Sequence, residues 1–148
     1  MPWRTVLGLV AAATVAWAVA LAATDGWAGI SEPLVLPGDE YLLEVPGIDS
    51  PGQFLEEFTT NLDGYVVHVR SHPPGFLLLL WFLDAVGLGG TGSAAVLCIG
   101  GGAAAGLAVL LAVRDVAGAA AARRAAPFVA LAPAAIWIAT TADAFSPG

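Results

Sequence analysis

The sequence predicts an all-α membrane protein with three transmembrane helices and a short interfacial helix in a long external loop. Hydrophobic residues make up 58% of the 148 residues and charged residues only 11%, and the mean hydropathy is +0.82. These values lie well outside the usage of ordinary globular proteins. Nine of the twelve acidic residues fall between Asp25 and Asp63. Four transmembrane helices are the alternative architecture.

Residues 1–24 are expected to contain the first transmembrane helix. The stretch from 5 to 24 carries no charge and is rich in Ala, Val and Leu, and about twenty helical residues reach roughly 30 Å, enough to cross a hydrocarbon core. A secretory signal peptide is the alternative, because Arg4 is followed by a cleavable Ala20-Leu21-Ala22 pattern. The apolar run is long for a signal peptide and further apolar segments follow it, so we expect an uncleaved anchor.

Residues 25–91 are expected to form an external acidic loop. Several Pro-Gly pairs interrupt it, so its regular structure must be short. Apolar residues near helical spacing in 53–69 predict one or two short amphipathic helices. Pro at the start and Gly after the end bound an interfacial helix at 74–87. Its roughly twelve residues reach about 18 Å, which is too short to span a bilayer unaided.

Residues 92–145 are expected to form two transmembrane helices, at 92–113 and 125–145, joined by an Arg-containing cytoplasmic loop. Pro133 predicts a kink in the second of them. If the interfacial helix crossed the membrane, the arginines of this loop would be external, against the tendency of Lys and Arg to collect on the cytoplasmic side. We therefore expect a multi-pass protein of the cell membrane with its acidic loop external.

The lipid bilayer is the main partner expected, and no nucleic-acid partner is expected for a chain of formal net charge −7. Gly102 and Gly106 form a small-xxx-small pattern in an apolar segment, which allows close helix packing and suggests a helix–helix partner. A merely Ala- and Gly-rich span is the alternative. Cys98 has no second cysteine for a disulfide, and the residues indicate no particular cofactor.

Two carboxylates, Asp39 and Glu40, are the candidate catalytic residues. A carboxylate held close to a membrane surface can act as general base for a sugar acceptor, although an acidic pair is also common in a solvated turn. Arg70 is the only basic residue other than histidine in the acidic loop. It is a candidate for holding a phosphate, with an ordinary ion pair to a nearby acid as the alternative.

His72 and Asp143 complete the candidate substrate-binding residues. His68 and His72 are four residues apart, but no third ligand is indicated and two prolines follow, so a metal site is not predicted. Asp143 lies near the end of the last apolar segment. An acid there is either interface polarity or part of a protein-lined cavity.

Taken together, the acidic pair Asp39-Glu40, the segment His72-Pro73-Pro74 and the later Asp143 resemble the start of the GT-C superfamily of membrane glycosyltransferases. The resemblance is to the protein O-mannosyltransferase and aminoarabinose-transferase type enzymes and covers most of the chain. It implies transfer of a sugar from a polyprenyl-phosphate donor, with Asp39 or Glu40 as base. The arginine usual near the start of the family's second span has no counterpart between residues 91 and 113.

The resemblance also implies many more spans than three, so the chain is expected to be the N-terminal part of a longer enzyme and inactive alone. The competing hypothesis is a small structural or interaction protein whose glycine-rich span binds a partner. A membrane-bound binding subunit that uses the acidic loop is a third. The sugar, the acceptor and the lipid carrier are not indicated by these residues.

Overall fold

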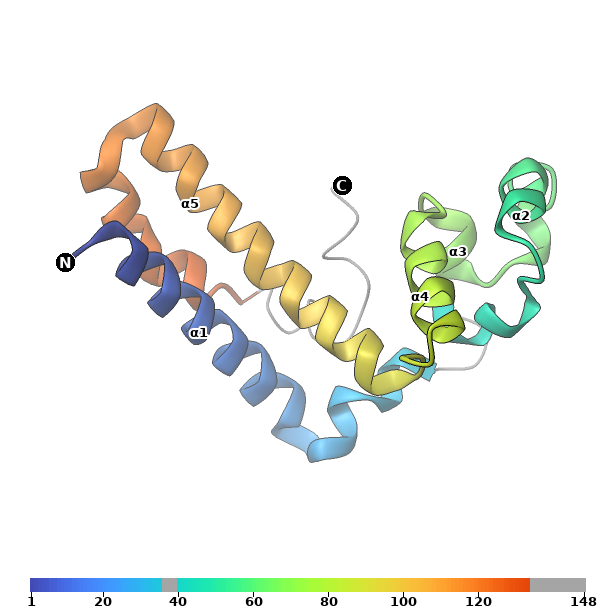
Figure 1. Ribbon diagram of the computed structural model, residues 1–148. Coiled ribbons are helices and arrows are strands. Elements are labelled where there is room, and N and C mark those ends of the chain that lie inside the picture. Colours follow the sequence, from blue (N-terminus) through green and yellow to red (C-terminus); the bar gives the residue numbers. More distant parts are fainter. Residues whose placement is uncertain (36–39, 134–148) are drawn as a thin grey trace.

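The computed structural model describes residues 1–35 and 40–133, and this part of the chain is helical throughout, without strands (Figure 1). The α-helices are α1 (Trp3–Ala22), α2 (Pro51–Glu57), α3 (Val67–Ser71), α4 (Gly75–Ala85) and α5 (Thr91–Ala130). The short 3₁₀ helices are η1 (Ala23–Asp25), η2 (Trp27–Ile30), η3 (Glu32–Val35), η4 (Tyr41–Leu43), η5 (Val45–Gly47) and η6 (Leu62–Gly64). The predicted all-α class is confirmed.

The elements form two arms that diverge like a V (Figure 1). We call the pair of α1 and α5 the long arm, and residues 40–85, from η4 to α4, the short arm. The first turns of α5 also pack against the short arm, where Ala94, Ala95 and Cys98 join its hydrophobic core. The chain therefore separates into a region of long helices and a region of short ones, as the distribution of proline and glycine predicts.

Helix α1 begins and ends within two residues of the predicted apolar run. One residue in every four along it is buried, and these are Val6, Val10, Thr14, Ala18 and Ala22. A spacing of four places them in one stripe along the helix, and this stripe contacts α5. Toward the short arm the buried residues become small, which lets the two backbones approach closely.

Helix α5 is a hairpin of two helical limbs rather than one rod. Gly118 has φ 84° and ψ 164°, outside the helical region, in a conformation that glycine adopts without steric cost. The chain reverses there, and residues 119–130 return beside α1 (Figure 1). The predicted connecting loop is wrong in its extent, because Arg114, Arg123 and Arg124 all lie within helical segments.

Two described helices, α1 and α5, are long and apolar enough to cross a membrane. The predicted third span, 125–145, is described only as far as 133, and Asp143 lies outside the described residues. Within the described part the return limb ends at Ala130, three residues before Pro133. The predicted kink at this proline concerns a span of which residues 134–145 lie outside the described residues, so it stays a prediction.

The surface of the long arm is largely apolar. Only 28% of the most apolar stretch of α1 and 22% of that of α5 is buried. The side chain of Val96 is 71% exposed, that of Val116 89% and that of Phe128 79%. Helices in the core of a water-soluble protein bury such residues, whereas helices in lipid leave them outside.

Aromatic and basic side chains fasten one end of the long arm. The guanidinium carbons of Arg114 and Arg123 lie 5.0 and 5.6 Å from the ring centroid of Trp3, within the range of cation–π attraction. Farther along α1, the indole N–H of Trp17 donates a hydrogen bond to the carbonyl of Ala132 at 3.3 Å. Trp3 and Trp17 therefore hold α1 against the return limb at two levels.

Helix α4 occupies Gly75–Ala85, within the predicted 74–87. Pro74 precedes its first turn, and Gly87 follows its end with φ 79°, as the proline and glycine signals predict. The indole N–H of Trp81 donates to the carbonyl of Ile48 at 2.9 Å and joins α4 to η5. With 11 residues, α4 is about 16 Å long, shorter than a hydrocarbon core.

The core of the short arm is built from large side chains. Its buried members include Tyr41, Phe54, Phe58, Val69, Phe76 and Leu77. Phe54 and Phe58 contact each other edge to face at 5.4 Å, and both contact the ring of Tyr65 at 5.6 Å. These contacts fix the orientation of the short helices, which are too short to be stable alone.

Candidate functional site

The predicted residues Glu40 and His72 belong to one cluster of side chains at the base of α4. Helix α3 ends at Ser71 because Pro73 forces the residue before it out of the helical region, and His72 is extended with φ −131° and ψ 160°. Helix α3 places His68 and His72 four residues apart and directs Val69, with no exposed surface, into the core. The two imidazoles therefore lie on one side of the α3–α4 junction.

Glu40 is almost fully buried, with 3% of its surface exposed. Its Oε1 lies 3.3 Å from Nδ1 of His68. This distance is within the range of an ion pair, but Nδ1 of His68 forms no hydrogen bond with another group in the described residues. The contact therefore brings the carboxylate and the imidazole close together without an aligned hydrogen bond.

Tyr41 is the centre of the cluster. Its ring is stacked on His68, with centroids 6.1 Å apart and an angle of 7°, and lies 6.4 Å from the ring of His72. The edge of Phe76, the second residue of α4, meets it at 5.1 Å. Tyr41 is 3% exposed, so it joins the segment of Glu40 to the His-Pro-Pro segment through the core.

The orientation of His72 is fixed by the backbone. Its Nδ1 lies 2.9 Å from the carbonyl oxygen of His68. Since a carbonyl oxygen only accepts, Nδ1 carries the proton and donates. In the neutral ring Nε2 is then an acceptor, and in the protonated ring it is a donor suited to an anionic ligand.

The other predicted site residues are less constrained. The side chain of Arg70 is exposed and forms no ion pair with any acid in the described parts of the chain. The alternative role of pairing with a nearby acid is thus absent from residues 1–35 and 40–133. Asp39 lies outside the described residues, as does Asp143.

His68 and His72 do not gather a set of metal ligands in the described residues. No group of three or more His, Cys, Asp or Glu side chains there is arranged to hold a metal ion. What the cluster offers chemically is a carboxylate and two imidazoles, with Arg70 on the same short helix but exposed. These groups suit proton transfer and anion binding.

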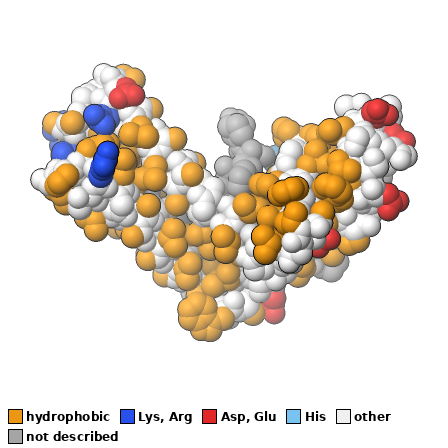
Figure 2. Space-filling model, in the orientation of Figure 1, with side chains coloured by type: hydrophobic (Ala, Val, Ile, Leu, Met, Phe, Trp, Pro, Cys, Tyr) orange, Lys and Arg blue, Asp and Glu red, His pale blue; other side chains and the backbone are white. Residues whose placement is uncertain are grey.

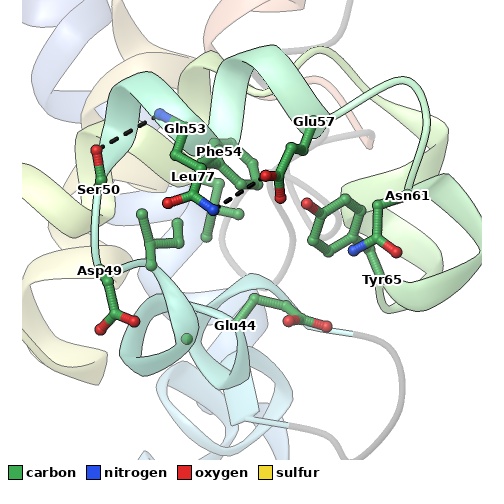
Figure 3. A pocket seen from close by; sticks show the side chains of 11 residues that line it. Glu44, Asp49, Ser50, Gln53, Phe54, Glu57, Asn61, Tyr65 and Leu77 are labelled. Atoms are coloured by element: carbon green, nitrogen blue, oxygen red, sulfur yellow. Dashed lines mark hydrogen bonds between the residues drawn. The ribbon is translucent and has the colours of Figure 1, made fainter.

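A second feature of the short arm is a hollow of about 190 Å³ lined mainly by polar side chains. Figure 3 shows three carboxylates around it, those of Glu44, Asp49 and Glu57. The remaining polar lining comes from Ser50, Gln53, Asn61 and Tyr65, with Ile48, Phe54 and Leu77 as its apolar part. Carboxylates, amides and a phenol together can donate and accept hydrogen bonds from a polyhydroxylated molecule.

Local hydrogen bonds hold this hollow in shape. Ser50 caps α2 and accepts from the backbone N–H of Gln53 at 3.5 Å, a role for which serine is preferred. The amide of Gln53 donates to Glu57 at 2.9 Å (Figure 3). Glu44 accepts from the backbone N–H of Val66 at 2.9 Å, which joins η4 to the start of α3.

The sequence did not predict the central role of Tyr41, the contact of His68 with Glu40, or the acidic hollow. Short helices and loops separate Tyr41 from His68 in the sequence. The spacing of hydrophobic residues does not predict a contact across such a segment. In the sequence, the acids that line the hollow could be recognised only as members of an acidic stretch, and not as neighbours in space. The buried Tyr41 next to an acidic pair was the one available signal, since tyrosine in a turn often packs into a core.

The glycines of the small-xxx-small pattern in α5 lie at a contact within the chain. Gly102 is buried, and a Cβ added to Gly106 would lie 3.2 Å from Cγ1 of Val129 in the return limb. The close approach that this pattern predicts is therefore made between the two limbs of α5. A partner protein at Gly102 and Gly106 stays a prediction.

Comparison of the chain with protein-family models, with curated proteins and with solved structures finds no match. The functional argument therefore depends on the residues and their geometry alone.

Proposed function

We propose that this chain is part of a membrane glycosyltransferase that uses a polyprenyl-phosphate sugar donor. The observation that carries the proposal is the meeting of Glu40 and His72 around Tyr41. The two segments that carry the resemblance to GT-C enzymes are 32 positions apart in the chain. Their convergence is what a shared site requires.

The proposed membrane location is supported by the apolar surface of the long arm. Burying side chains such as Val96, Val116 and Phe128 in hydrocarbon stabilises the folded chain by about 25 cal/mol per Å² of apolar surface removed from water. In water the same surface would promote association. We propose that the short arm lies on the external side, where the donor headgroup and the acceptor meet.

In the proposed reaction a carboxylate removes the proton from an acceptor hydroxyl. The hydroxyl oxygen forms a bond to the anomeric carbon of the sugar, the bond between that carbon and the phosphate oxygen breaks, and the polyprenyl phosphate leaves with the electron pair. Arg70 and the Nε2 side of a protonated His72 bind the phosphate as its charge develops. The acidic hollow, through Asp49 and Glu57, holds hydroxyl groups of the acceptor or sugar.

The two predicted carboxylates take different parts in this proposal. Glu40 is 3% exposed and lies against His68, so an acceptor cannot reach it without a rearrangement. We assign proton removal to Asp39, and assign to Glu40 the positioning of the segment that carries it. This assignment separates two roles that the sequence left open between the two acids.

The test uses the protein as it occurs in membranes and measures transfer from radiolabelled polyprenyl-phosphate mannose. Asp39→Asn should lower kcat by at least about 100-fold, the scale of general-base catalysis, with unchanged membrane insertion. Glu40→Gln keeps the shape of the side chain and should lower activity less, while increasing protease sensitivity of the short arm. Asp63→Asn, which removes an exposed acid, is the matched control and should have no effect.

Full activity of Asp39→Asn would exclude Asp39 as the base. If Glu40→Gln lowered kcat as much as Asp39→Asn does, without any change in protease sensitivity, the role of general base would belong to Glu40. Absence of transfer with this donor and with polyprenyl-phosphate aminoarabinose, in the longer enzyme of which the chain is proposed to be a part, would overturn the proposed activity.

A further inference from the structure

An apolar groove of about 370 Å³ runs between α1 and the return limb of α5. Its lining residues are Met1, Val6, Leu9, Val10, Ala13, Arg123, Ala126, Pro127 and Ala130. Among these described residues Arg123 has the only charged side chain, and Met1 adds the N-terminal amino group. Along α1 the groove extends from Val6 to Ala13, about 10 Å of helix.

The end of the groove at Arg123 is strongly basic. Arg4, Arg114 and Arg124 lie at the same end of the long arm, with Asp115 the one acid among the described residues of these helix ends. Figure 2 shows basic side chains gathered there, with acidic side chains mostly on the short arm. The groove thus presents a cation at one end and hydrocarbon along the rest.

The guanidinium of Arg123 is available to a ligand. Within residues 1–35 and 40–133 it forms no hydrogen bond and no ion pair, and its contact with Trp3 is to the ring face. The contact with Trp3 restricts the side chain, so less conformational entropy is lost on binding. A planar guanidinium is suited to bidentate binding of a phosphate.

We propose that this groove binds an anionic phospholipid of the surrounding bilayer, with its phosphate on Arg123 and one acyl chain against Val6, Val10 and Ala13. Charge complementarity selects this occupant, because the bilayer supplies molecules with a phosphate at one end and hydrocarbon beyond it. Basic residues near an anionic leaflet attract such lipids by about 1 kcal/mol each. The inference rests on the proposed membrane location, but not on the proposed glycosyltransferase activity.

The test is native mass spectrometry of the purified full chain after incubation with phosphatidylglycerol or phosphatidylcholine. The wild-type protein should retain at least about 10-fold more phosphatidylglycerol than phosphatidylcholine. A hydrogen bond to a charged group contributes binding free energy on this scale. Arg123→Gln should remove this preference. Arg124→Gln removes the same charge from the adjacent, exposed residue, which does not line the groove, and should keep the preference.

A second pair of variants tests the groove itself. Ala13→Phe places a large side chain inside the groove and should abolish retention, whereas Ala12→Phe adds the same side chain to an exposed face of α1 and should not. Equal losses in Arg123→Gln and Arg124→Gln would show nonspecific attraction and overturn the proposal. Undiminished retention in Ala13→Phe would show that the retained lipid is bound outside the groove and would also overturn the proposal.

The membrane location is checked separately by alkaline carbonate extraction. If the wild-type chain were released into the soluble fraction, the premise of the inference would fail, whatever the result for lipid retention. Retention with the expected variant pattern, together with absence of sugar transfer in the longer enzyme, would leave the lipid site established and remove only the proposed activity.

Discussion

The two arms are both helical but are stabilised by different interactions. The long arm is held by a contact between α1 and α5 that includes many small side chains, and by Trp3 and Trp17, and it leaves large apolar residues outside. The short arm buries large side chains such as Phe54 and Leu77 inside and exposes most of its acids, with Glu40 as the buried exception. The difference shows that apolar side chains are mainly outside in one arm and mainly inside in the other, which is what the proposed membrane location requires of the long arm.

The largest expected effect concerns the placement of the two arms relative to the membrane. We predict that alkaline phosphatase fused after Gly90 is active and that the same reporter fused after Ala119 is inactive. The reason is that α4 is too short to cross and that the arginines near Ala119 favour the cytoplasmic side. The opposite pattern would make α4 a true span and break the proposed external site.

The next effect tests the core of the short arm. Leu77 has no exposed surface, so Leu77→Ala should lower the free energy of unfolding of this arm by about 2–5 kcal/mol. Leu55→Ala, at a position 50% exposed, is the control with little effect. Urea titration in detergent, followed by protease cleavage within residues 40–85, measures both. Equal effects would mean that this core is not packed as described.

A smaller effect is expected where α1 meets α5. Ala18 is 1% exposed, so Ala18→Leu should overpack the contact and cost about 1–3 kcal/mol. Ala20→Leu makes the same change on an exposed face and should be neutral. The measurement is thermal unfolding of the helices by circular dichroism in micelles. If Ala20→Leu were the more harmful variant, the buried face of α1 would be assigned wrongly.

The smallest effect concerns the cation–π contacts at the end of the long arm. Trp3→Ala should destabilise the packing of α1 by about 1 kcal/mol. It should also shift the sites of protease cleavage toward the N-terminus of α1. Trp27→Ala, at a position 77% exposed, is the control. A null result in the same circular dichroism experiment would show that Arg114 and Arg123 are solvated rather than fixed by Trp3.

The parts of the fold that the sequence predicted are those with strong local signals. Helix α1 was predicted from an unbroken apolar run, and α4 from Pro74 and Gly87, because each signal acts within one or two turns of helix. The reversal between the two predicted spans was expected as a loop, but its position at Gly118 was not, since one glycine in an Ala-rich stretch does not distinguish a reversal from a tolerated helix residue.

The candidate site was predicted in its components but not in its arrangement. Glu40, Arg70 and His72 were identified as single residues, and the contact of Glu40 with His68 depends on packing around Tyr41. Such packing is set by contacts between residues far apart in sequence, which periodicity does not encode. The acidic hollow was missed for the same reason, because Glu44 and Glu57 meet only when η4 and α2 pack together.

The reversal at Gly118 has a consequence for everything that follows it in the chain. A helix of the 40 residues of α5 without a break would be about 60 Å long, twice the thickness of a hydrocarbon core. One left-handed residue instead divides it into two limbs and returns the chain toward the side from which α5 came. A residue with a Cβ is strained at φ 84°, so the return of residues 119–130 beside α1 depends on a single hydrogen atom standing where other residues carry a side chain.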